Sequence, residues 1–533
     1  RCGGAAAQSN NGKSANARTY LPGTDNLPVD LVVRLADPMP KKNATWQSIG
    51  LLCLRTAVLC CICQHAGVDV RAQVPTWSSA FEQEVQENAQ GYRWLRLSTE
   101  HIGHRLTGSA QGARAENLAD SLFRASGLPV VERFPFTAQA WSRGTVQLTI
   151  SDGAGALHIA AVALANTPLE SSVEAPLLDA GNGLPEDLAR LGDRAKGAAL
   201  LINIGLVAAM EGARNLHRSE KAALAMEAGA AALVFVNQVE GHILLTGTAS
   251  IDGTLIPVPA ACIATEDGVA LRERLAKHEA LTARLAMGNH SNLVSACNII
   301  AEIHGTSMPE EVIVVGGHLD CWDLATGATD NGLGSFSILD LARAMAGFSH
   351  KPERTVRFVL FMGEEQGLLG SRALVKHYKE SGELARVKCM INLDMSGNPQ
   401  GFGVGGPDGW GDLIGALSKE ISTIDTTSFQ GKVSQEVWLH SDHQPFLLAG
   451  VPVIYPLSDL GKHVYGCYHS SCDDIHLVDP QAMVNNVRFV GQLIYRLAAT
   501  RDLPPAFSEE GLRQRLIDAK LEQPLRIGGD WPW

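Results

Sequence analysis

The sequence predicts an α/β protein with a mixed, mostly parallel sheet flanked by helices. Four short aliphatic runs, at residues 312–315, 355–361, 390–393 and 451–455, have the pattern of strands buried on both faces. Residues 335–342, between the first two runs, place apolar side chains at helical spacing. Strands that alternate with helices are typical of parallel sheets. We therefore expect the ends of several strands to converge on one site.

Histidines and carboxylates follow these runs, at the strand ends where open α/β sheets bind ligands. They lie in six short motifs: Gly316-Gly317-His318-Leu319-Asp320, Thr329-Asp330-Asn331-Gly332, Gly363-Glu364-Glu365-Gln366-Gly367, Asn392-Leu393-Asp394, Ser441-Asp442-His443 and Tyr468-His469. Two imidazoles and three carboxylates among them form an oxygen-rich ligand set suited to a pair of zinc ions. A further carboxylate, Glu364, stands beside a candidate ligand and is free to transfer protons. Asp320 can hold the second ring nitrogen of His318.

Each motif alone is weak, because a His-x-Asp or Glu-Glu sequence is usually an ordinary polar pair. An aspartate after an apolar strand is often a helix cap. The combined set is stronger evidence, since the main motifs end strands in α/β order, with glycines where the backbone must approach closely. This joint occurrence favours a metal site.

The motifs resemble those of the zinc exopeptidases that include bacterial co-catalytic aminopeptidases, glutamate carboxypeptidase II and carboxypeptidase Q. The likeness is closest to the carboxypeptidase Q branch, through the runs Gly317-His318-Leu319-Asp320-Cys321-Trp322-Asp323 and Glu364-Glu365-Gln366-Gly367. It covers residues 80–500, including Gly103-His104-Arg105-Leu106-Thr107-Gly108-Ser109. The resemblance implies the zinc exopeptidase fold with two Zn²⁺ ions.

The resemblance also assigns roles to seven residues: His318 and Asp394 on one zinc, Glu365 and His469 on the other, Asp330 bridging both, Glu364 as general base and Asp320 as the partner of His318. The sequence departs from the family at Asn331, where an aspartate is common. Cys321 and Cys472 also stand where small or polar residues are frequent. None of these departures removes a ligand, so the resemblance implies an active enzyme.

The expected function is that of an exported metalloexopeptidase acting on short peptides or dipeptides. A zinc-activated water would attack the peptide carbonyl, with Glu364 moving its proton. His443, Tyr465 or Tyr468 could donate a hydrogen bond to the developing oxyanion, although a structural role is the simpler interpretation of each. Two alternatives stay open: an amidohydrolase or glutaminyl-cyclase-like enzyme on the same fold, and a binding protein without metal. The sequence leaves open which peptide end is read, and whether the chain forms a homodimer.

Composition agrees with a globular enzyme. The 533 residues are 45% hydrophobic and 19% charged, and their number predicts two or three globular units. The net charge of −12, without a Lys/Arg cluster, argues against a nucleic-acid partner. We expect four parts after the leader: an N-terminal part of the peptidase domain at 73–165, an inserted domain resembling protease-associated domains at 166–285, the catalytic part at 286–505 and a surface tail at 506–533.

The leader carries an export signal in our interpretation. Residues 1–38 read as a disordered or read-through segment and support no fold prediction. Residues 39–72 read as a signal peptide cleaved after Ala72, and an N-terminal anchor or a buried helix is the alternative. Arg55 interrupts the apolar stretch, which argues against a membrane span. The expected location is therefore secreted or periplasmic. Whether Cys467 and Cys472, which flank His469, form a disulfide stays open at this stage.

Overall fold

The computed structural model describes residues 75–207 and 214–533. The predicted signal peptide at 39–72 and the segment before it lie outside the described residues. Among the helices that are described, none is both long and apolar enough to cross a membrane.

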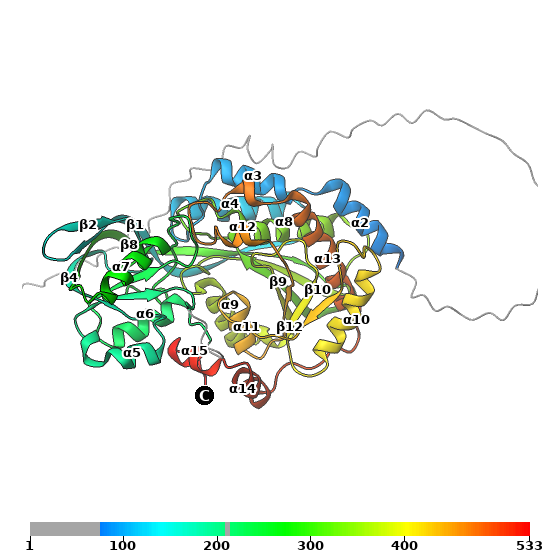
Figure 1. Ribbon diagram of the computed structural model, residues 1–533. Helices are drawn as coiled ribbons and strands as arrows, with labels where there is room; N and C mark the ends of the chain where they lie inside the picture. The colour runs from blue at the N-terminus through cyan, green and yellow to red at the C-terminus, as the bar shows by residue number, and fades with distance from the viewer. Residues whose placement is uncertain (1–74, 208–213) are drawn as a thin grey trace, which may run out of the picture.

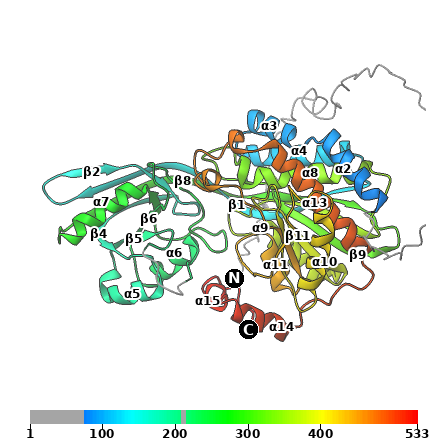
Figure 2. The ribbon, with the colours of Figure 1, turned by 45° about the vertical axis from the view of Figure 1, so that its right-hand side comes forward.

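Two lobes share one continuous sheet (Figures 1 and 2). Its 14 strands include the path β13-β12-β14-β11-β9-β10-β8-β4-β5-β6-β7-β3. The strands β1 (Val130–Ser151) and β8 (Thr282–Ile303) pair antiparallel along almost their whole length and run from the larger lobe into the smaller one. The predicted boundary between the peptidase part and the inserted domain falls between residues 165 and 166. The chain has already entered the smaller lobe along β1 by that point, because β1 and β8 extend through both lobes.

The larger lobe has the predicted mixed, mostly parallel sheet. Its central strands run parallel and its two flanking strands antiparallel: β9 (Met308–His318), β10 (Arg354–Phe361), β11 (Val387–Asn392) and β14 (Val453–Pro456), with β8 and β12 (Gly401–Gly405) beside them. The expected strands at 312–315, 355–361, 390–393 and 451–455 fall on these four parallel strands, with end shifts of a few residues.

Helices cover both faces of this sheet, so its strands are buried on both sides. One face packs against α2 (Thr76–Asn88), α3 (Gly91–His101), α4 (Ala110–Ala125), α8 (Leu333–Gly347), α10 (Trp410–Ser422) and α13 (Pro480–Ala499). The other face packs against α9 (Leu369–Ser381) and α11 (His443–Leu448). Along β10, Phe358 and Leu360 enter the first core, while Val359 and Phe361 enter the second. Full burial of each such side chain stabilises the fold by about 1.5–3 kcal/mol.

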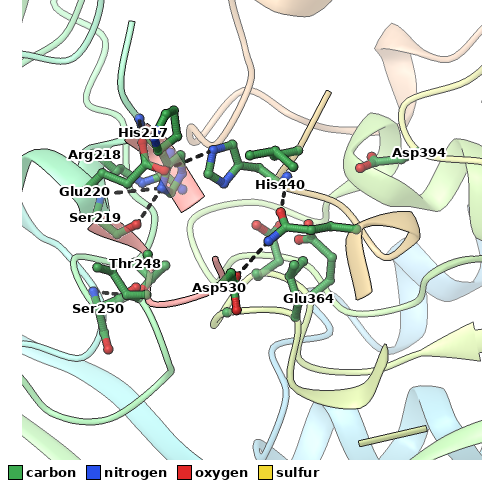
Figure 3. Close-up of a pocket in the computed structure, with 18 of the residues that line it drawn as sticks. His217, Arg218, Ser219, Glu220, Thr248, Ser250, Glu364, Asp394, His440 and Asp530 are labelled. Carbon is green, nitrogen blue, oxygen red and sulfur yellow. Dashed lines mark hydrogen bonds and ion pairs between the residues drawn. The ribbon is translucent and has the colours of Figure 1, made fainter. Parts of the chain in front are cut away.

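The smaller lobe is an α/β unit of its own. Four of its strands run parallel and a fifth pairs antiparallel: β4 (Glu170–Asp179), β5 (Ala199–Asn203), β6 (Ala232–Val236), β7 (Ala260–Ile263) and β3 (Ala161–Ala163). Its helices are α5 (Pro185–Leu191), α6 (Arg218–Glu227) and α7 (Thr265–Ala276). The first turn of α6 faces the larger lobe, which places Arg218 near the strand ends described below (Figure 3).

The expectation of a surface tail at 506–533 is wrong. The segment forms α14 (Glu509–Asp518) and α15 (Glu522–Ile527), which lie against the larger lobe (Figure 1). Leu512, Leu516, Leu521 and Leu525 are each at most 3% exposed and join the core around α9. Each leucine pair is four residues apart and forms one apolar helix face. The charged residues between the leucines obscure this pattern in the sequence.

Candidate metal centre

The predicted ligands come from adjacent strand ends of the larger lobe. His318 is the last residue of β9, while Glu365 and Asp394 follow β10 and β11. Asp330 precedes α8, and His469 lies in a loop after the short helix α12 (Lys462–Tyr465). Because β10, β9 and β11 are neighbours, their carboxyl ends meet at one edge of the sheet.

The five side chains form two groups joined by Asp330. In the first, His318 Nε2 lies 3.3 Å from Asp394 Oδ1 and 3.3 Å from Asp330 Oδ1. In the second, His469 Nε2 lies 3.0 Å from Glu365 Oε2 and 3.0 Å from Asp330 Oδ2. Each oxygen of Asp330 therefore faces its own imidazole and its own second carboxylate. A carboxylate so placed can bridge two cations.

The donor atoms of this centre fit metal ions. His318, Asp330 and Glu365 offer ligand atoms within 4.8 Å of one another, and all three residues are buried. Glu365 Oε1 accepts no hydrogen bond from the described residues. A buried carboxylate oxygen without a donor costs free energy, and a bound cation removes that cost. The arrangement therefore suits two divalent ions with nitrogen and oxygen ligands.

Hydrogen bonds hold the Asp330 loop in position. Asp473, which the sequence analysis did not identify, accepts from Thr329 N at 2.8 Å, Thr329 Oγ1 at 2.6 Å and Asp330 N at 3.0 Å. The Asn331 side chain accepts from Met395 N at 3.1 Å and donates to Leu393 O at 2.8 Å. A carboxylate cannot donate. The asparagine that departs from the family therefore links the loops of Asp330 and Asp394.

Asp320 contacts His318 chiefly through its backbone. His318 Nδ1 lies 3.1 Å from Asp320 O and 3.7 Å from Asp320 Oδ1. The carboxylate itself accepts from Glu364 N at 3.3 Å. Asp320 thus lies between the predicted ligand and the predicted base.

Glu364 and Glu365 point to different parts of the centre, although they are adjacent in sequence. Glu365 contacts His469, whereas Glu364 lines the pocket above the ligands. Burial raises the pKa of Glu364 well above its ordinary value, and the opposing charge of His318 reduces the shift. Burial likewise raises the pKa of Glu365 to about 7, against the effect of His469. The raised pKa makes Glu364 a carboxyl group suited to hold a proton.

The three expected oxyanion donors differ in position. Tyr468 lines the pocket and stacks on His469 with ring centroids 3.7 Å apart. His443 is buried outside the pocket lining, with Nε2 2.9 Å from Trp438 O. Tyr465 is 46% exposed and also lies outside the lining. Of the three, only Tyr468 faces the site.

The loop that carries His469 is fixed from both sides. A disulfide joins Cys467 to Cys472 around it. Thr246 of the smaller lobe donates its backbone N–H to His469 O at 2.9 Å. The smaller lobe therefore takes part in positioning a predicted metal ligand.

The metal centre opens into a pocket of about 280 Å³ between the lobes (Figure 3). Sequence analysis missed most of its lining: His217, Arg218, Ser219, Glu220, Thr248, Ser250 and Ile251 from the smaller lobe, Arg372, Met395, Trp438, Leu439, His440 and Gln444 from the larger one, and Pro524, Leu525, Gly528 and Asp530 from the last helix and the residues after it. No local motif marks these residues, because they come from separate segments.

Arg218 is a buried cation beside the metal ligands. The residue is 5% exposed, and its Nη2 lies 3.0 Å from His469 Nδ1. Its Nε has no hydrogen-bond partner among the described residues. The guanidinium packs over Gly247, where a Cβ would lie 1.9 Å from Nε. A glycine is therefore required there to make room for the cation.

Two family models and several known proteins match parts of this chain. The model of peptidase family M28 matches residues 298–494, and the PA domain model matches residues 171–271. Carboxypeptidase Q from Bos taurus is 26% identical over 405 residues, covering 74% of this chain and 82% of the relative. Aminopeptidase YwaD from Bacillus subtilis is 28% identical over 452 residues, covering 80% and 89%.

Solved structures show the same fold. A zinc aminopeptidase from Bacillus subtilis superposes with a TM-score of 0.58 at 26% identity, covering 76% of this chain and 94% of its own. A peptidase M28 precursor from Shewanella amazonensis gives a TM-score of 0.69 at 22% identity, covering 81% and 98%. The fold and the site together define a zinc metallopeptidase. Its catalytic lobe contains a match to peptidase family M28 at residues 298–494, and the smaller lobe contains a match to the PA domain at residues 171–271, inserted in that fold. The predicted fold and the resemblance to zinc exopeptidases are thus confirmed.

Proposed function

We propose that this chain is a two-zinc exopeptidase that hydrolyses dipeptides and other short, unblocked peptides. The observation that carries the proposal is the position of Asp330, whose two oxygens each face a separate histidine–carboxylate pair. The zinc aminopeptidase named above, on the same fold, supports zinc as the metal.

In this proposal each chain residue has a defined task. His318 and Asp394 would hold one ion, His469 and Glu365 the other, and Asp330 both. The ions would supply an activated water and a Lewis acid for the peptide carbonyl. Glu364 accepts the proton of the attacking water and delivers it to the leaving amine. The Tyr468 hydroxyl can donate a hydrogen bond to the carbonyl oxygen as its negative charge grows.

The pocket lining supports a short substrate with an apolar side chain. Met395, Trp438, Leu439, Ile251 and Leu525 give the pocket apolar walls. Its volume of about 280 Å³ lies near the small end of ligand pockets. A folded protein chain does not fit such a space between two lobes.

Arg218 favours a substrate whose free carboxylate lies close to the scissile bond. If His469 held zinc through Nε2, its Nδ1 would carry the ring proton. Nδ1 could then no longer accept a hydrogen bond from Arg218, and the buried guanidinium would be stabilised by an anionic partner. The terminal carboxylate of a dipeptide is such a partner, and this favours a dipeptidase over an aminopeptidase acting on long chains.

Export through the signal peptide at 39–72 is part of the proposal. The disulfide between Cys467 and Cys472 supports it, because such bonds persist in oxidising compartments.

The purified chain should hold two zinc ions per molecule, because the ligand set forms two groups. Elemental analysis by mass spectrometry after gel filtration measures the ratio directly. A ratio of one would contradict the two-ion site. No zinc after gentle dialysis would also contradict it and would favour the alternative of a metal-free binding protein.

Amidation of a dipeptide should lower kcat/KM by at least about tenfold, because it removes the charge that Arg218 binds. Comparing Ala-Leu with Ala-Leu amide measures the effect. Arg218→Gln should bring the two substrates to similar kcat/KM values. Arg272→Gln, which removes an arginine that pairs with Asp179 elsewhere in the same lobe, is the matched control and should keep the preference.

If acetylation of the amino end lowers kcat/KM and amidation of the carboxyl end does not, the chain is an aminopeptidase and the role given to Arg218 is wrong. Equal hydrolysis of free, acetylated and amidated dipeptides would indicate a general amidase.

A further inference from the structure

Residues 519–533, here called the closing segment, form one wall of the pocket that contains the metal centre. Pro524, Leu525, Gly528 and Asp530 line this pocket together with Glu364. In Figures 1 and 2, α15 of the closing segment lies below the gap between the two lobes. No motif of the proposed chemistry uses the segment, so its position needs a separate explanation.

The closing segment is anchored to the larger lobe by charge and by burial. Arg372 of α9 binds Asp530 with two hydrogen bonds, one of them from Nη2 to Oδ2 at 2.6 Å. Gln444 of α11 donates to the same Asp530 Oδ2 at 2.8 Å. Paired arginine–carboxylate bonds fix orientation more firmly than a single contact does. Leu521 and Leu525, both at most 1% exposed, hold the segment against the core.

The closing segment also touches the inserted lobe. Arg214 donates to Ala519 O at 2.8 Å, and α15 contacts α6, the helix that begins at Arg218. The segment therefore joins the two lobes across the pocket. In Figure 3, Asp530 lies between Ser250 of the inserted lobe and Glu364 of the larger lobe.

We propose that the closing segment determines the length of the substrate, with the Arg372–Asp530 ion pair holding it in place. A peptide bound at the metal centre extends until it meets this wall, so additional residues collide with the segment or displace it. The ion pair makes displacement costly. The inference rests on the proposed peptidase function and explains why the enzyme prefers short peptides.

A purely stabilising role for the segment predicts a different pattern. The buried leucines already pack α14 and α15 against the core, and a role in stability alone does not require a carboxylate and its arginine in the pocket lining. The side chains of Arg372 and Asp530 are 34% and 15% exposed, so both reach the space that a substrate would occupy.

The test measures kcat/KM for alanine peptides of two, three, four and six residues with the zinc-loaded full chain. Wild type should hydrolyse the hexapeptide at least about tenfold less efficiently than the dipeptide. Asp530→Ala and Arg372→Ala should each raise the hexapeptide-to-dipeptide ratio at least about tenfold. The double variant should match the single variants, because both remove the same ion pair. Asp530→Asn, which keeps the side-chain shape, replaces Asp530→Ala if that variant does not fold.

The matched control is Arg526→Ala. Arg526 lies on α15 and pairs with Glu522 away from the pocket lining. This variant should keep the wild-type ratio, and zinc content and melting temperature verify that each variant is folded.

Three results separate the hypotheses. If the ion-pair variants lower both rates equally, the segment is only structural and the inference is wrong. If wild type hydrolyses all lengths equally, the segment does not limit length. If zinc-loaded wild type cleaves no peptide at all, the proposed function itself fails, and the inference fails with it.

Discussion

Replacing Glu364 with glutamine should lower kcat by at least about a hundredfold while both zinc ions stay bound, since this is the usual contribution of a general base. Glutamine keeps the size of the side chain but cannot accept the proton of the attacking water. Glu364 lines the pocket beside the five candidate ligands. Steady-state hydrolysis of a dipeptide, with elemental analysis of the same sample, measures both quantities.

Glu365→Gln is the matched control, because the same substitution is made at the adjacent residue. Glu365 lies 3.0 Å from His469 Nε2, so its loss should remove zinc as well as activity. If Glu364→Gln loses metal and Glu365→Gln retains it, the roles of the two residues are exchanged.

Replacing Asp330 with alanine should release both zinc ions and lower kcat/KM by at least about a thousandfold, roughly 4 kcal/mol of transition-state stabilisation. The reason is geometric, since among the described residues Asp330 alone pairs with both His318 and His469. Isothermal titration of the metal-free variant with zinc measures the lost affinity. Loss of only one ion would show that Asp330 is a terminal ligand.

Asp340→Ala provides the comparison for a buried aspartate without metal contact. Asp340 lies on α8 and accepts hydrogen bonds from Gln90 N and Gly91 N at the start of α3. Its loss should lower the melting temperature and leave the zinc content unchanged.

Asp473→Asn should give an intermediate result, with zinc affinity lowered about 10–100-fold, because Asp473 positions the loop of Asp330.

Sequence analysis predicted the sheet and the centre of the site because both depend on local signals. Buried parallel strands are continuous aliphatic runs, and metal ligands are a small set of residue types that follow those runs. The same reasoning failed for 506–533, where the charged residues between the leucines concealed two buried helices. The inserted domain, predicted to start at residue 166, lies close to the PA domain match that starts at residue 171. The smaller lobe as folded also includes the end of β1, because one long strand carries no break in composition.

By itself, the sequence identified the candidate ligands, a candidate base beside them and the resemblance to zinc exopeptidases. These residues are recognised by their type and by their position at the end of a strand. Both features can be identified from a few consecutive residues. Only the tertiary structure decided what surrounds that chemistry. Arg218, Arg372 and Asp530 come from distant parts of the chain and meet at one pocket because two lobes and a closing segment pack together there. No local sequence pattern predicts these contacts, because the residues are brought together by packing and not by their spacing along the chain.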